Sequence, residues 1–197
     1  MAFVLFPPLY EVFDFTVAIF EPFFYLCRYF GFLGPIQIEL YELMLFHILR
    51  MENNFQWLTR GNVSMPQLDL PRVERWIRDV AATHNRICGP LTYVFCDDPT
   101  ILDVNRQFLS HDYFTDIITF DDSRGRLLRG DMFISLDTVR SNAEGLACEY
   151  GRELMRVIIH GVLHLCGIND KGPGEREIME ANENAALALW DEMNCCL

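Results

Sequence analysis

This chain has a single lysine, and its cysteines show no spacing typical of disulfide or metal-binding pairs. Of the 16 basic residues only Lys171 is a lysine, and all the others are arginines. The seven cysteines are odd in number and contain no C-x-x-C pair, so no disulfide framework is predicted. A reducing, cytoplasmic location is the compartment that this cysteine pattern indicates.

Long uninterrupted apolar runs are also missing, although the first 50 residues are rich in apolar side chains. Roughly two-thirds of residues 1–50 are apolar, against about 45% of the remainder, and the latter is ordinary for a globular domain. Charges and prolines interrupt this segment so often that no run approaches the ~18 residues that span a bilayer. A basic start followed by one apolar stretch, as in a secretory signal, is missing too. A membrane location is therefore not expected.

Residues 1–50 leave three interpretations open. They form a membrane-surface or partner-binding appendage, they form a hydrophobic lid, or they are not translated in the cell because the start codon was placed too early. Met51 opens a segment of ordinary composition, which favours the third interpretation. Residues 51–197 are then expected to form a single domain.

The formal net charge of −12 argues against a general nucleic-acid coat protein, because binding to phosphates requires local positive charge. Arginine, however, suits bidentate contacts with phosphate and stacking on bases. A local group of arginines could therefore still bind RNA, and the net charge alone does not decide the function.

From Met51 onward, residue patterns predict one α+β domain without internal repeats, with a small mixed sheet of about four strands and about five helices. Strands are expected over residues 91–96, 116–120 and 130–136, with an early strand within 51–64. Helices are expected over 71–86, from a cap at Asp98 onward, from a cap at Asp137 to about Leu146, over 149–166 and over 174–193. The second helix should bury Ile101, Leu102, Val104 and Phe108.

The stretch HGVLHLCGIND, residues 160–170, carries the clearest chemical signal. His160 and His164 are four residues apart on a largely apolar helix, so both rings can reach one ion. Gly167 is suited to end that helix, which would allow Asp170 to supply a third ligand. Two imidazoles and a carboxylate suit Zn²⁺ and leave a position open for water, although nickel, iron and manganese remain open. The alternative is a pair of core histidines that are merely hydrogen-bonded.

A glutamate after the first histidine is missing. The zinc proteases with the motif H-E-x-x-H use that glutamate as the general base, and here Gly161 takes its position. A protease of that kind is therefore disfavoured.

With its flanks, HGVLHLCGIND resembles the signature H-G-x-L-H-L-x-G-y-D-H of the YbeY family, endoribonucleases of bacterial ribosomal RNA maturation. Residues 104–120, VNRQFLSHDYFTDIITF, are similar to a second family stretch, and Gly130-Asp131 with MFISL to a third. The acidic helix with Glu177, Met179 and Glu180 is similar to the family's ending. The resemblance covers residues 65–190.

The resemblance implies a metal-dependent endoribonuclease that acts on single-stranded RNA. The expected role is maturation of the 3′ end of 16S rRNA and ribosome quality control, with the small ribosomal subunit and its proteins as partners and no role for DNA. It implies one Zn²⁺ per chain, bound by His160, His164 and Asp170. The alternative is a ribosome-assembly factor that binds rRNA and ribosomal proteins without catalysis and uses its metal structurally.

Two positions depart from the family pattern. The family's third ligand is usually histidine, whereas this chain has Asp170, preceded by Asn169. The family also has an arginine, thought to contact the RNA phosphate, where this chain has Leu109. Arg106, one helical turn earlier, and His111 are the candidates to replace its charge, with Arg106 as the predicted catalytic residue.

Other residues in the matched stretches allow both a functional and a structural interpretation. Thr115 and Asp116 could line the cleft or could form the turn that starts a strand, and Asp131 has the same two possibilities. Lys171 could contact an RNA phosphate or could be a solvated loop residue.

Overall fold

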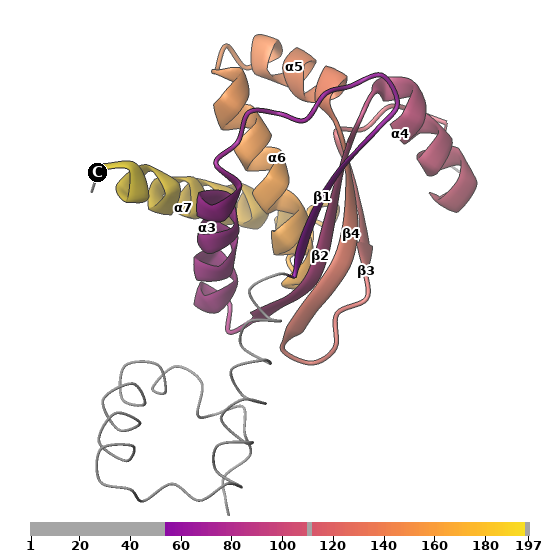
Figure 1. Cartoon of the computed structure of the whole chain (residues 1–197). Coiled ribbons are helices and arrows are strands. Elements are labelled where there is room, and N and C mark those ends of the chain that lie inside the picture. Colours follow the sequence, from indigo (N-terminus) through magenta and orange to yellow (C-terminus); the bar gives the residue numbers. More distant parts are fainter. Residues whose placement is uncertain (1–53, 110–111, 196–197) are drawn as a thin grey trace, which may run out of the picture. The chain divides into compact units, whose positions relative to one another are not determined.

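A four-stranded mixed sheet forms the centre of the computed structural model, which describes residues 54–109 and 112–195 (Figure 1). Its strand order is β1-β2-β4-β3. The strands are β1 Phe55–Arg60, β2 Ile87–Cys96, β3 Ile117–Asp121 and β4 Leu127–Ser135. β1, β2 and β4 run parallel, and β3 pairs antiparallel with β4 at the edge. The interpretations of residues 1–50 concern a segment that lies outside the described residues.

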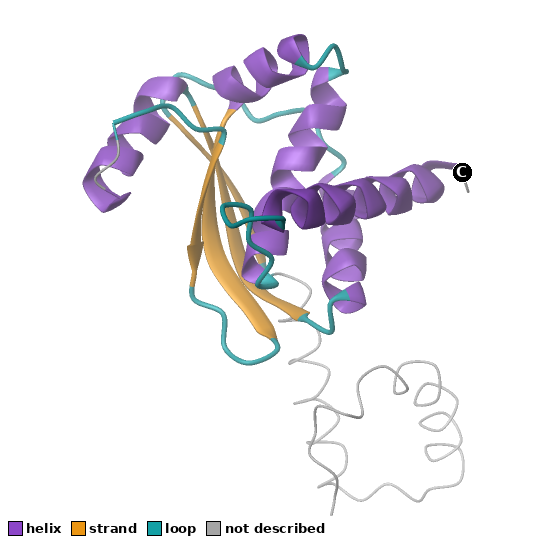
Figure 2. Ribbon diagram, turned by 180° about the vertical axis from the view of Figure 1, so that it is seen from behind, coloured by secondary structure: helices purple, strands orange, loops and turns teal. Residues whose placement is uncertain are grey.

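Helices cover both faces of this sheet, as the two opposite views show (Figure 1, Figure 2). One face carries α3 Leu70–Thr83, α6 Tyr150–Leu165 and α7 Glu175–Cys195. The other carries α4 Asp98–Val104, which continues as the π-helical turn η1 Asn105–Leu109. Helix α5 Leu136–Gly145 joins β4 to α6. The predicted α+β class, with four strands and five α-helices in the described part, is confirmed.

Alternation along the strands divides the apolar residues between two cores. Met132 and Ile134 of β4 face the larger core, and Phe133 between them faces the smaller core under α4. This follows from the two-residue repeat of a strand, in which successive side chains point to opposite faces. Residues on α6 and residues on α4 therefore approach the sheet from opposite sides.

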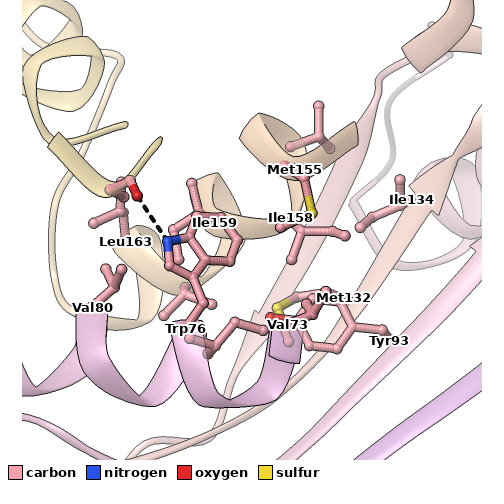
Figure 3. Packing of buried hydrophobic residues seen from close by; sticks show 14 of the residues in the cluster. Val73, Trp76, Val80, Tyr93, Met132, Ile134, Met155, Ile158, Ile159 and Leu163 are labelled. Atoms are coloured by element: carbon pink, nitrogen blue, oxygen red, sulfur yellow. Dashed lines mark hydrogen bonds between the residues drawn. The ribbon is translucent and has the colours of Figure 1, made fainter. Parts of the chain in front are cut away.

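Trp76 of α3 is the largest side chain at the centre of the main core (Figure 3). It is fully buried, and its indole Nε1 donates a hydrogen bond to the Ala186 carbonyl oxygen at 2.8 Å. The bond satisfies the one polar atom of the indole, whose burial without a partner would be costly. It also ties α3 to α7, so the three helices on this face form one packed layer.

The predicted helix caps differ from the observed ones. The second helix is capped by Asp97, whose carboxylate accepts from the Thr100 N–H at 3.1 Å, rather than by Asp98. The Asp98 carboxylate accepts from the Thr138 hydroxyl at 2.7 Å. The third helix is capped by Ser135 rather than Asp137. In each case a side chain one or two residues earlier has the extended backbone that a cap requires.

Phe108 was expected to be buried, and this prediction is wrong. Its side chain is 59% exposed and meets Phe120 edge-on, with ring centroids 5.5 Å apart. The chain changes from α-helical to π-helical winding at Asn105, which adds a residue to the turn and rotates the following side chains away from the expected face. Of the residues that precede this change, Ile101 and Val104 are buried as predicted, whereas Leu102 is half-buried.

Two strands are longer than predicted. β2 begins at Ile87 and accommodates Gly89-Pro90 by a shift of register between Cys88 and Leu91, and β4 begins at Leu127. Such a bulge allows a proline inside a strand, because the residue is freed from the ladder of hydrogen bonds. The early strand expected within 51–64 is confirmed as β1. None of the helices in the described ranges combines the length and apolarity needed to cross a bilayer.

At Gly161, α6 packs tightly against the sheet. A Cβ atom there would lie 2.8 Å from Ile117 Cδ1 and 3.0 Å from Met132 Sδ, whereas one at Gly151 of the same helix would meet nothing within 4 Å. We expect Gly161→Leu to lower the free energy of unfolding by about 2–3 kcal/mol through overpacking. The matched Gly151→Leu should raise it by up to about 1 kcal/mol through helix propensity. Urea denaturation measures both changes, and equal effects would contradict this packing.

Candidate metal centre

Three potential metal-binding side chains converge at the C-terminal end of α6. His160 and His164 lie on the helix, and Asp170 lies in the loop that follows it. One donor atom from each residue lies within 4.8 Å of the other two. Among the described residues, this is the group of side chains close enough together to hold a metal ion. The His160 and His164 Nε2 atoms lie 3.7 and 3.9 Å from Asp170 Oδ2. The structure thus brings together all three residues predicted as ligands.

The end of α6 explains how Asp170 reaches the histidines. Gly167 has φ +93°, a left-handed conformation that glycine adopts readily and other residues rarely do. Its N–H donates to the His164 carbonyl at 2.9 Å, and the Ile168 N–H reaches back to the Leu163 carbonyl at 3.0 Å. These two bonds end the helix and reverse the chain, which directs the loop back over the histidine side chains.

Hydrogen bonds at Nδ1 fix the tautomers of both rings. His160 Nδ1 lies 2.7 Å from Glu183 Oε1 on α7, and His164 Nδ1 lies 2.9 Å from the Ile168 carbonyl oxygen. A carboxylate and a carbonyl can only accept, so each Nδ1 carries the proton. The lone pair of each neutral ring is then on Nε2, the atom that faces Asp170. This is the arrangement in which outer partners orient histidine ligands for a metal.

The donor set fits a divalent ion. Ligands at 2.0–2.1 Å from a tetrahedral ion are about 3.4 Å apart, close to the observed separations of 3.7 and 3.9 Å between the imidazole Nε2 atoms and the carboxylate. Two imidazoles and one carboxylate also leave a coordination position for water or substrate. All three side chains are partly exposed, so solvent can reach the group.

Glu183 and Arg156 take part in this centre and were missed in the sequence. The Glu183 carboxylate accepts from His160 and also pairs with Arg156 Nη1 at 3.2 Å, while Arg156 Nε lies 3.4 Å from the buried Glu153. The signal that could have revealed Glu183 is its spacing. It lies four residues after the buried Met179, on the face of α7 that packs inward, where an unpaired carboxylate would be costly.

The two histidines differ in their electrostatics. Burial lowers the pKa of His160, but the hydrogen bond and charge of Glu183 outweigh it, so the pKa of His160 is raised above 6.5. Burial and the charge of His160 lower the pKa of His164 below the same value. Burial raises the pKa of Glu183, yet the His160 and Arg156 contacts reverse this and hold it below 4.5. The histidine with the carboxylate partner thus binds a proton more tightly.

Arg106, predicted as the catalytic cation, lies in η1 on the other side of the sheet from α6. Its side chain is 53% exposed, and its guanidinium pairs with Asp112 at 2.6 and 2.7 Å. This pair links η1 to the segment that precedes β3, as does the bond from Asn105 Nδ2 to the Tyr113 carbonyl at 2.8 Å. A catalytic role for Arg106 stays a prediction. The Leu109 side chain and His111 lie outside what the structure describes.

The remaining residues from the matched stretches have mostly structural contacts. Asp116 accepts from the Ile117 N–H at 2.9 Å and from Asn142 Nδ2 at 3.2 Å, and the Thr115 hydroxyl donates to the Ile117 carbonyl at 3.2 Å. These bonds form the turn that starts β3. Asp116 is still close enough for its charge to raise the pKa of His160. Asp131 and Lys171 are exposed.

Comparison with known proteins places these observations in a family. The sequence profile described as Endoribonuclease YbeY matches residues 62–191. A protein of that name from Phocaeicola vulgatus is 63% identical over 127 residues, which are 64% of this chain and 92% of the relative. Another from Parabacteroides distasonis is 58% identical over 131 residues, which are 66% of this chain and 92% of the relative. A Thermotoga maritima protein with a solution structure is 21% identical and aligns with a TM-score of 0.48, covering 70% of this chain and 92% of that chain.

The opposite pKa shifts of the two histidines can be measured in the metal-free protein. We expect His160 to titrate above pH 6.5 and His164 below it, resolved by proton NMR of the imidazole C–H signals. Glu183→Gln should lower the pKa of His160, because the charge that stabilises the imidazolium is lost. The pKa of His164 should then rise, since His160 repels its proton less. Identical titration of both rings would contradict the observed contacts.

Proposed function

The chain belongs to the endoribonuclease YbeY family, and from this premise we propose that it is a metal-dependent endoribonuclease that cleaves single-stranded RNA at the centre formed by His160, His164 and Asp170. The observation that carries this proposal is the convergence of the three donors, with both Nδ1 atoms already bonded elsewhere. We infer Zn²⁺ as the ion, because two imidazoles and a carboxylate suit it.

Each residue of the centre has its own role in the proposed reaction. A divalent cation bound there supplies the Lewis acidity that phosphodiester hydrolysis requires. The His160 and His164 rings present Nε2 lone pairs, and their Nδ1 partners keep them in the required orientation. Asp170 adds the one negative charge among the donors. Glu183, whose pKa the His160 and Arg156 contacts hold below its usual value, stabilises positive charge that His160 would gain on coordination.

The cellular role belongs to the same proposal. We propose that the substrate is ribosomal RNA, that cleavage matures the 3′ end of 16S rRNA, and that the small ribosomal subunit is the partner in the cytoplasm. The similarity of residues 104–120 and 160–170 to the family stretches supports this. A purely non-catalytic assembly factor is not favoured, because the relatives compared are named as endoribonucleases.

Asp170 provides the most direct test of the centre. We expect Asp170→Ala to lose more than about 99% of its metal affinity and its RNA cleavage, because only two neutral donors remain. The neighbouring Asn169→Ala, a change at an exposed loop position, should retain both. Metal content after dialysis is measured by mass spectrometry, and cleavage is followed on a labelled single-stranded RNA. Full metal content and cleavage in Asp170→Ala would contradict the ligand assignment.

Glu183 tests the role of the outer partner. We expect Glu183→Ala to weaken metal binding by about 10- to 100-fold, because the His160 ring loses the acceptor that orients it. Glu183→Gln keeps an oxygen acceptor and should lose less. Glu180→Ala, an exposed acidic residue on the same helix, is the control of equal charge change. Competition with a chelating dye measures the affinities, and equal losses in Glu180→Ala and Glu183→Ala would refute a specific role.

A further inference from the structure

Four arginines gather where the turn between β3 and β4 meets the end of α6. We call them the hairpin cluster, and its members are Arg86, Arg124, Arg126 and Arg129. Arg124 and Arg126 belong to the β3–β4 connection, which lies at the lower end of the sheet in Figure 1. Arg129 lies near the start of β4, and Arg86 precedes β2. With Arg86, residues 121–131 carry four arginines and three aspartates, a local charge of about +1 in a chain whose net charge is −12. The proposed reaction at the metal centre does not use them.

Hydrogen bonds to the backbone hold the cluster together. Arg126 Nε donates to the Asn85 carbonyl oxygen at 2.9 Å, and the Ile87 N–H donates to the Arg126 carbonyl at 2.9 Å. The Arg86 guanidinium donates to the Gly125 carbonyl oxygen through Nη1. The β3–β4 turn and the start of β2 are therefore fixed to each other by two of the arginine side chains, Arg86 and Arg126.

Arg86 also connects the cluster to the metal centre. Its Nη2 donates to the carbonyl oxygen of Cys166, the residue that follows α6, at 3.1 Å. Cys166 precedes Asp170 by four residues, and four extended residues span at most about 14 Å. The start of β4 is close to the same end of α6, because a Cβ atom at Gly130 would lie 3.1 Å from Leu165 Cδ2. An RNA strand that reaches the metal centre can therefore also reach the cluster.

The charges of Arg124 and Arg129 are available to a ligand. Asp122 is their ion-pair partner, with its carboxylate 3.9 Å from Arg124 and 3.3 Å from Arg129. The carboxylate is 60% exposed and Arg124 is 74% exposed, and pairs of this kind are weak because water screens them. The Asp121 carboxylate accepts a hydrogen bond from the Ser123 N–H at 2.7 Å. A phosphate can therefore replace Asp122 as the arginine partner.

From this geometry we infer that the hairpin cluster binds the backbone phosphates of the single-stranded RNA whose cleavage the metal centre performs. The inference rests on the proposed function. Arginine is suited to the task because its planar guanidinium donates two parallel hydrogen bonds to phosphate oxygens. Because phosphates are the same in every sequence, the cluster would add affinity and direction without selecting bases.

The test uses the full-length, metal-loaded protein and a fluorescent oligouridylate of about 12 nucleotides. Binding is recorded by fluorescence anisotropy in the first seconds after mixing, and cleavage is assayed in parallel. The double variant Arg124→Gln/Arg126→Gln should bind roughly tenfold more weakly in low salt. The plot of log K against log salt concentration should become less steep. The magnitude of its slope should decrease by about 1.4, which corresponds to two phosphate contacts on a single strand.

The control is Arg60→Gln/Arg75→Gln, which removes the same charge at exposed positions on β1 and α3. Its affinity and salt slope should stay near those of the wild type. Equal weakening in both double variants would show a general charge effect and would overturn the inference, as would unchanged binding in both. If the wild type binds but does not cleave, the proposed function fails, and the comparison of the variants still decides the role of the cluster.

A second variant should act in the opposite direction. Asp122→Asn removes the carboxylate that pairs with Arg124 and Arg129, while the backbone bond from the Asp122 N–H to the Arg129 carbonyl remains possible. RNA binding should tighten about threefold, since the phosphate no longer competes with a carboxylate. Weaker binding by Asp122→Asn would contradict the inference even if the arginine variants proved unstable.

Discussion

The hydrogen bond from His164 Nδ1 to the Ile168 carbonyl oxygen joins the fold to the chemistry of this protein. It closes a short loop between a buried helix and the segment that carries Asp170. The loop requires the left-handed turn at Gly167, and it fixes one imidazole tautomer at the same time. The helix itself is held by its packing on β3 and β4, where Gly161 allows close contact. The position of the third donor therefore depends on the core of the domain.

A second chain of contacts supports the other histidine from within the protein. Glu153, Arg156 and Glu183 alternate in charge and lead from the buried side of α6 to His160 in the metal centre. Burying isolated charges is costly, and each member here has an oppositely charged or hydrogen-bonding partner. Since the His160 and Arg156 contacts together hold the pKa of Glu183 below its usual value, the acceptor for His160 is an ionised carboxylate. A buried network can thereby set the properties of a group that remains accessible to a substrate.

The sequence predicts most of what is local in this structure and little of what depends on distant partners. The spacing of His160 and His164, and the glycine after the helix, predicted how three donors meet. Glu183 was missed because its partner is 23 residues away, and only the packing of α7 against α6 brings them together. Phe108 was placed wrongly because a π-helical turn has no simple sequence signal. The caps were displaced by one or two residues, since neighbouring Asp and Ser side chains compete for the same role.

Asp170 and the hairpin cluster are connected through electrostatics. With a divalent ion, two histidines and an aspartate leave a net charge of about +1, whereas three histidines would leave +2. The weaker positive charge attracts a polyanion less, in a chain whose net charge is already −12. Affinity for RNA then depends more on cations outside the metal centre. Arg86, which is bonded to the end of the same helix, and the arginines of the adjoining β3–β4 hairpin supply such cations near the metal centre. Arginines remain charged at every physiological pH.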